Sequence, residues 1–279
     1  MPATGEPHRV VLVALGRPEA ARACLAAAGQ AAAVLGGARI LALAPHPPAS
    51  AMILPSEQVL TAELRAAFER QTESGIAALR RSFDAWRREP DAAAAAAEWV
   101  EAEGSAETVV AEHGQAAELV VVAARPAAHE SAEKELPAAL LETHRPVLVV
   151  PDRIGARIGR HVCIAWHDDA PATAAVVAAM PFLAAADRVT VLQASRDGAP
   201  GTAGGPPAIL AEHRIAAEMH PVATSGAATG EALLAAAHTV GGDLLVLGAY
   251  AHSRLRERLL GGVTATVLQT TDIPLLMRH

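Results

Sequence analysis

The chain has 279 residues, about twice the common size of one domain, so it has room for two compact units. Its formal net charge of -7 opposes the phosphate neutralisation that drives most nucleic-acid binding, and no basic stripe with interleaved aromatics is present. No apolar run reaches the roughly 20 residues needed to cross a bilayer, and residues 1–9 lack the pattern of an export signal. We therefore expect a cytoplasmic protein without a direct nucleic-acid or membrane role.

The cysteines and histidines do not predict a disulfide or a metal site. Cys24 falls in a helical pattern and Cys163 in a strand pattern, so both are interpreted as small buried hydrophobes, as suits a reducing compartment. The 12 histidines show no pair one helical turn apart with a nearby carboxylate. We expect no metal site.

The sequence repeats one α/β unit. Residues 9–14 and 161–166 are continuous apolar runs, typical of strands buried on both faces of a parallel sheet, and an alanine-rich helix pattern follows each. The later predicted strands are residues 39–43, 99–102, 118–122 and 145–150 in the first unit, and 188–192, 219–222, 243–247 and 272–277 in the second.

Strands that alternate with helices at this spacing imply right-handed crossovers and a parallel sheet. The predicted fold class is α/β, with two tandem doubly wound, Rossmann-like domains at residues 1–151 and 159–279. The first unit carries an extra predicted helix at about 57–88, whose apolar side chains we interpret as core or partner contacts. These side chains are Leu64, Phe68, Ile76, Leu79, Phe83 and Trp86.

A glycine loop follows the fourth predicted strand of the second unit. Ligands of doubly wound sheets lie outside the carboxyl ends of the strands, so this loop is the main candidate site. Gly248 lets the backbone leave the strand, while Gly261 and Gly262 keep amide groups open at the start of the last helix. The partial positive charge of that helix end and the Thr264 hydroxyl complete a predicted phosphate site that needs no lysine.

With these residues, the chain resembles the universal stress protein family over both halves, as a tandem pair. The ATP-binding branch of that family has glycine, two residues, glycine, nine residues, then glycine followed by Ser or Thr. Gly248, Ala251 and Gly261 occupy the three glycine positions here, with alanine at the second. Gly262 stands in place of the hydroxyl residue, which leaves Thr264 as a substitute.

Two further stretches carry the resemblance. The loop that includes His252 and Val263 is similar to a bacterial tandem subgroup of the family. After their first strand, family members place an aspartate that contacts adenine, and His167 aligns with it, between Trp166 and Asp168. The first unit has no loop glycines at residues 123–126, so we expect it to bind no nucleotide.

The resemblance implies an adenine nucleotide alpha hydrolase-like fold and a stress-response sensor or regulator that is not an enzyme. The implied ligand is ATP or another adenine nucleotide, alone or with Mg²⁺, in the C-terminal unit. Related single-domain proteins resemble dimers joined through their final strands, so the tandem chain is expected to be an intramolecular pseudo-dimer. Protein partners and a homodimer of the whole chain are further expectations.

Other interpretations stay open. The loop is also consistent with an inherited strand-to-helix connection without a ligand, in a stress protein that works through protein contacts. His167, Asp168 and Asp169 equally fit a solvated loop and helix N-cap. In a slow ATP hydrolase, Asp168 or His167 would instead orient water near the γ-phosphate. The sequence has no Gly-x-Ser-x-Gly elbow, no Walker lysine and no dinucleotide fingerprint after its first strand, so other catalysis is not predicted.

Overall fold

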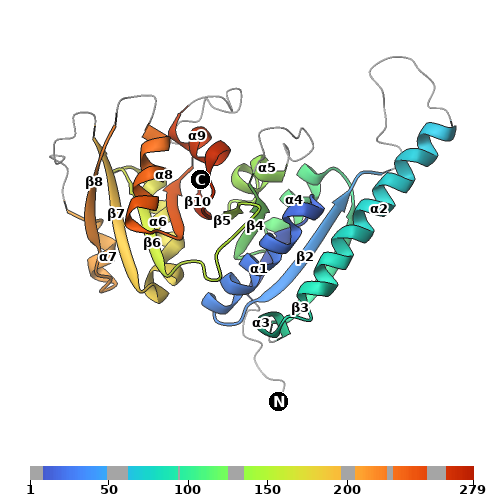
Figure 1. Cartoon of the computed structure of the whole chain (residues 1–279), viewed down its shortest axis with the longest axis horizontal. Helices are drawn as coiled ribbons and strands as arrows, with labels where there is room; N and C mark the ends of the chain where they lie inside the picture. Colours follow the sequence, from blue (N-terminus) through green and yellow to red (C-terminus); the bar gives the residue numbers. More distant parts are fainter. Residues whose placement is uncertain are drawn as a thin grey trace.

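The computed structural model describes residues 9–48, 62–93, 95–124, 135–195, 205–224, 229–249 and 262–279. Helices and strands alternate in both halves of the chain (Figure 1). The first half contains β1 (Val10–Ala14), α1 (Pro18–Val34), β2 (Arg39–His46), α2 (Ala62–Trp86), α3 (Pro90–Ala93), β3 (Ala97–Glu103), α4 (Ala106–Gly114), β4 (Leu119–Ala123), α5 (Glu135–Leu141) and β5 (Val147–Val150). The second half contains β6 (His161–Trp166), α6 (Ala170–Ala185), β7 (Arg188–Ser195), α7 (Ala208–Glu212), β8 (Glu218–Ala223), α8 (Thr229–Val240), β9 (Leu244–Gly248), α9 (Val263–Thr270) and β10 (Leu275–Arg278).

All the described strands belong to one sheet with the order β3-β2-β1-β4-β5-β10-β9-β6-β7-β8. Neighbours within each half run parallel, whereas β5 and β10 run antiparallel where the halves meet. The register pairs Leu148 with Leu276, each the second residue of its strand. The two halves are therefore related by an approximate two-fold arrangement and join through their final strands, as expected from the sequence.

The predicted strands are confirmed, including the third strand of each half, which is β3 in the first and β8 in the second. The final strands begin later than predicted, after Pro146 and Pro274. A proline has no N–H to donate to a sheet ladder, so it stays at the strand entrance. The carbonyl groups of these prolines still accept hydrogen bonds, from Val120 N at 3.0 Å and Leu245 N at 2.9 Å.

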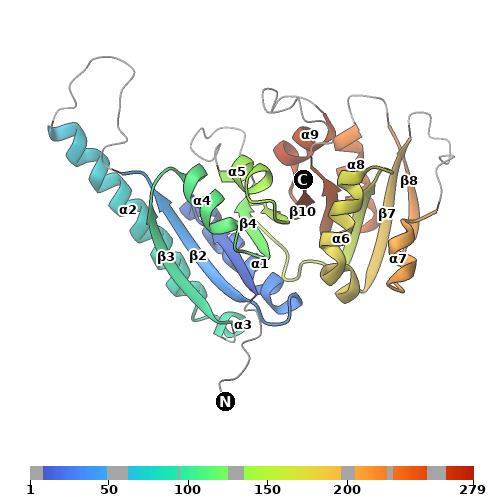
Figure 2. The same ribbon diagram turned by 180° about the vertical axis from the view of Figure 1, so that it is seen from behind.

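Each face of the sheet is covered by its own hydrophobic layer (Figures 1 and 2). Residues of α1, α2, α6 and α7 pack on one face, and residues of α4, α5, α8 and α9 pack on the other. Alanine is the main buried residue of α1, because small side chains let a helix lie close to the sheet. Cys24 and Cys163 are free and buried in these layers, which confirms their interpretation as small hydrophobes.

The extra helix α2 is partly a core element. Phe83 and Trp86 are buried near its end, and the ring centroids of Phe83 and of Trp99 in β3 are 5.5 Å apart. Its first half projects beyond the sheet (Figure 1), and Leu64 there is 44% exposed. Phe83 and Trp86 are therefore core contacts, whereas Leu64 is exposed because the sheet ends before the helix does, and a partner contact there stays a prediction.

The segment between the two halves is attached to both of them. Ile158 N donates to Gln30 Oε1 of α1 at 2.7 Å. The Asp243 carboxylate accepts from the backbone N–H groups of Gly159, Arg160 and His161 at 2.9, 3.1 and 3.1 Å. None of the helices in the described ranges has the length and apolar character required to cross a membrane.

Candidate functional site

The carboxyl edge of the second half brings several of the predicted site residues to one side of the sheet. Gly248 ends β9, Gly262 caps α9, and His167 follows β6, the strand beside β9. Ala251, His252 and Gly261 were also predicted site residues and lie outside the described residues, as does Tyr250. The described edge is thus made by the end of one strand, the start of one helix and the turn between β6 and α6.

Gly248 is required by a close approach of backbones. A Cβ on this residue would lie 2.7 Å from both the Ala172 nitrogen and the Pro171 carbonyl carbon. Both atoms belong to the first turn of α6, so a side chain at this position would force that helix away from β9. The sequence predicted that glycine lets the chain leave the strand, and the structure gives the specific obstacle.

The start of α9 is open. Gly262 has a backbone φ of 104° and, among the described residues, no atom lies within 4 Å of where its Cβ would be. As a glycine at the N-cap position, it has no side chain that could cap the helix. Val263 is 38% exposed and Thr264 is half-buried. The first amides of an α-helix have no partner within the helix, so this end has the local geometry to bind an anion.

The start of α9 is held in position by α8. A Cβ on Gly230, in the first turn of α8, would lie 2.9 Å from the Val263 carbonyl oxygen and 2.9 Å from Thr266 Cβ. This tight packing fixes the helix end and leaves it accessible. Gly230 was not among the predicted site residues, because a glycine inside a helical pattern carries no separate signal.

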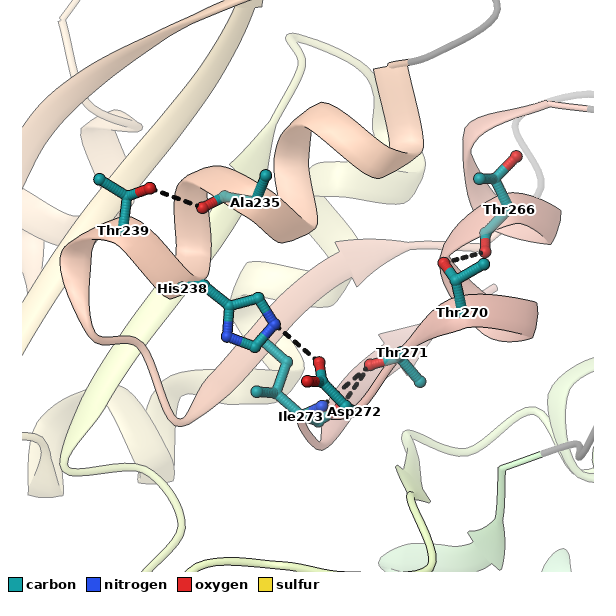
Figure 3. Close-up of polar contacts among 8 residues, drawn as sticks. All are labelled: Ala235, His238, Thr239, Thr266, Thr270, Thr271, Asp272 and Ile273. Carbon is teal, nitrogen blue, oxygen red and sulfur yellow. Dashed lines mark hydrogen bonds and ion pairs between the residues drawn. The ribbon is translucent and has the colours of Figure 1, made fainter.

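The far end of α9 is held by polar contacts (Figure 3). His238 of α8 contacts Asp272, with Nε2 and Oδ1 2.7 Å apart, and both side chains are exposed. The Thr271 hydroxyl donates to the Ile273 carbonyl oxygen at 2.5 Å. Both contacts position the connection between α9 and β10, so α9 is fixed at both ends.

The turn after β6 contains a helix cap. Asp169 Oδ1 accepts from Ala172 N at 2.8 Å and so caps α6, while its Oδ2 lies 3.2 Å from His167 Nδ1. This confirms the interpretation of Asp169 as an N-cap. His167 is 84% exposed, Asp168 is exposed and Trp166 is half-buried at the end of β6. His167 and Asp168 are therefore the polar side chains that this turn leaves accessible.

The corresponding edge of the first half contains a buried polar cluster that the sequence did not predict. Arg17, the N-cap residue of α1, is 7% exposed and donates to the Ala124 carbonyl oxygen at 2.7 Å and to Asp152 at 3.3 Å. Glu135, the first residue of α5, is also 7% exposed. Burial raises the pKa of Glu135 from 4.5 to about 7, and the positive charge of Arg17 opposes this rise.

The described residues contain no group of three or more His, Cys, Asp or Glu side chains that could hold a metal ion. The elements of this edge and the mainly parallel sheet define a pair of doubly wound, Rossmann-like α/β units in tandem. The sequence profile of the Universal stress protein family matches residues 160–279. The second unit therefore belongs to this family, as the resemblance implied.

Solved structures extend the likeness of fold to both units. The chain is similar to a universal stress protein from Archaeoglobus fulgidus, at 13% identity over 97% of each chain with a TM-score of 0.69. It is also similar to a functionally unknown protein from Pseudomonas aeruginosa, at 15% identity over 96% of this chain and 91% of that chain with a TM-score of 0.53. No curated protein matches the chain. These likenesses show the tandem fold.

Proposed function

We propose that the second unit binds an adenine nucleotide at its carboxyl edge, and that the chain acts as a cytoplasmic stress-response sensor or regulator rather than as an enzyme. The open start of α9 is the observation that carries this proposal. Gly262, at the N-cap position, adds no side chain at this helix start and so offers no side-chain cap to the amides of α9.

Charge and position support a phosphate as the ligand group. A helix start has a partial positive charge of about half an elementary charge, which favours an anion there. The loop from Gly248 to Gly262 connects this helix to β9, at the edge where doubly wound sheets bind ligands. The spacing of Gly248 and Gly261 matches that of the ATP-binding branch of the family. We propose that the phosphates contact the first turn of α9 and that the base lies toward Trp166 and His167.

A second candidate function is protein binding without a nucleotide. Ala251 stands where the ATP-binding branch has glycine, so a methyl group is added to the loop. Val263 is an exposed apolar side chain at the start of α9, and Leu64 is another on the projecting half of α2. They lie in different units, so each is a separate candidate contact and not part of one patch.

Ligand analysis separates the two functions. We expect mass spectrometry of the denatured purified protein to release an adenine nucleotide, and calorimetric titration with ATP, ADP and AMP to show binding. Gly262→Val should abolish binding, because a branched side chain is disfavoured at φ 104° and would crowd the amides of α9.

Gly241→Val is the matched control. Gly241 also has a positive φ, 76°, and open space around its Cβ position, but it lies in the turn between α8 and β9, at the opposite end of that strand. Its substitution should strain the backbone to a similar degree and leave binding intact. Absence of released nucleotide together with no heat at millimolar ligand would favour the protein-binding function.

A further inference from the structure

The buried cluster at the carboxyl edge of the first unit combines a guanidinium, which could bind an anion, with a carboxyl group of the same chain. Arg17 contributes a guanidinium that is 7% exposed, and its Nε has no hydrogen-bond partner among the described residues. A buried cation with an unused donor is unfavourable unless a negative group compensates it. The Glu135 side chain lies at this edge with the same low exposure.

The Glu135 carboxylate lies directly against the turn that follows β1. A Cβ on Gly16 would be 1.8 Å from Glu135 Oε1 and 2.6 Å from its carboxyl carbon. The carboxylate therefore occupies the space that a side chain on Gly16 would take. Gly16 precedes Arg17, so the carboxyl group lies against the same turn that positions Arg17, and the charge of Arg17 acts on its pKa.

Several charged and titratable groups surround this carboxylate. Arg17 precedes α1, Cys24 lies on α1 and Asp152 follows β5. Burial raises the pKa of the Cys24 thiol to about 12, Glu135 adds to this rise, Arg17 opposes it, and Asp152 adds a smaller contribution. Asp152 and Glu19 contact Arg17 at 3.3 and 3.7 Å, but both are more than half exposed. Among these three acidic residues, Glu135 is thus the one whose carboxyl group is buried.

The second unit has a different arrangement at the equivalent positions. The N-cap of its first helix is Asp169 instead of Arg17, and the first residue of its last helix is Val263 instead of Glu135. We propose that the Glu135 side chain fills the ligand position of the first unit near Arg17 and closes this position to phosphate groups from solution.

Removal of the carboxylate tests this proposal. In Glu135→Ala, the full chain should gain one site for inorganic phosphate and for AMP, with affinity at least tenfold above that of the wild type, as measured by calorimetric titration. Glu135→Gln keeps the shape of the side chain, so it should gain no such site. Glu107→Ala removes an exposed acidic residue from the first turn of α4 and serves as the matched control.

Gly16→Ala is an independent variant, because its new Cβ would displace the flexible end of Glu135 without removing a charge. Phosphate should raise the melting temperature of Glu135→Ala and of Gly16→Ala more than that of the wild type. Absence of this increase and of the additional site in both variants overturns the proposal. The gain is counted relative to the wild type, so it is distinguishable from any ligand bound by the second unit.

Discussion

The two carboxyl edges of this molecule are built on the same fold and differ in charge. In the first unit, Arg17 stands before α1 and Glu135 begins α5, and both are buried. In the second unit, Asp169 caps α6, and Gly262 precedes an exposed Val263 at the start of α9. One edge contains a buried guanidinium and a buried carboxyl group, whereas the described start of α9 at the other edge is exposed. We propose that the first copy has thereby lost access to ligand while it keeps the topology of the fold.

The strand pairing that joins the two units is separate from both carboxyl edges, so the two edges can differ within one fold. The antiparallel pairing of β5 and β10 depends on backbone hydrogen bonds and on buried residues such as Leu148 and Leu276, which do not take part in either edge. Sequence changes at one edge therefore leave the ten-stranded sheet intact. The comparison of the two edges can be tested by separate changes at each of them.

The largest expected effect on stability comes from substitution of Glu135. Its folded pKa, about 7, lies above the ordinary value of 4.5, so the folded state binds more protons than the unfolded state between these values. The stability of the protein should consequently fall as pH rises from about 4.5 to 7. Glu135→Gln should remove this fall and be more stable than the wild type by up to about 3 kcal/mol above pH 8.

Urea unfolding of both proteins from pH 4 to pH 9 measures this difference. The two stabilities should converge below pH 4.5, where the carboxyl group is neutral in both states. A constant difference across the pH range would show that Glu135 is not the group that titrates.

At the second edge, Gly248→Ala should destabilise the protein by about 2 to 3 kcal/mol, because the new methyl group would overlap backbone atoms of Pro171 and Ala172. The equivalent strand end of the first unit is Ala123, and Ala123→Gly should lower stability by about 1 kcal/mol or less through backbone entropy. Thermal unfolding followed by circular dichroism compares the two variants. Equal effects would contradict the close approach at Gly248.

A smaller effect is expected at the helix cap. Asp169→Ala removes the acceptor of the Ala172 amide and should lower stability by about 1 kcal/mol. Asp168→Ala changes an exposed neighbour and should stay within about 0.5 kcal/mol of the wild type. Chemical denaturation of the two variants tests whether the acid of this turn works as a cap. A reversed order of the two effects would refute that role.

The smallest effect concerns the exposed contact in Figure 3. His238→Ala should change stability by about 0.5 kcal/mol or less. In an exposed ion pair, the loss of side-chain entropy offsets most of the favourable electrostatic energy. The variant should bind nucleotide like the wild type, because Asp272 lies at the end of α9 opposite Gly262. A loss of nucleotide affinity in calorimetric titration would mean that this contact positions the open helix start.

Much of the fold could be predicted from the sequence. Continuous apolar runs such as residues 119–122 identify strands that are buried on both faces, and their repetition predicts two similar units. The role of Asp169 was one of two predicted alternatives, because its position before an apolar helix fits an N-cap. Gly248 and Gly262 were also identified as special positions.

The remaining features depend on contacts between residues far apart in the sequence. Glu135 resembles any acidic residue at a helix start, and its approach to Gly16 arises only when α5 packs against β4, the strand next to β1. The exposure of Leu64 could not be predicted for a similar reason. The spacing of four residues from Leu64 to Phe68 is the same as that from Leu79 to Phe83, which are buried. Local patterns report periodicity, whereas the end of the sheet decides which part of a helix is covered.

The number of nucleotides bound per chain tests the central comparison most directly. We predict that native mass spectrometry with AMP, ADP or ATP will find one adenine nucleotide per chain in the wild type and none in Gly262→Val, with Gly241→Val unchanged. Two nucleotides per chain in the wild type, or one that persists in Gly262→Val, would contradict a single open edge in the second unit.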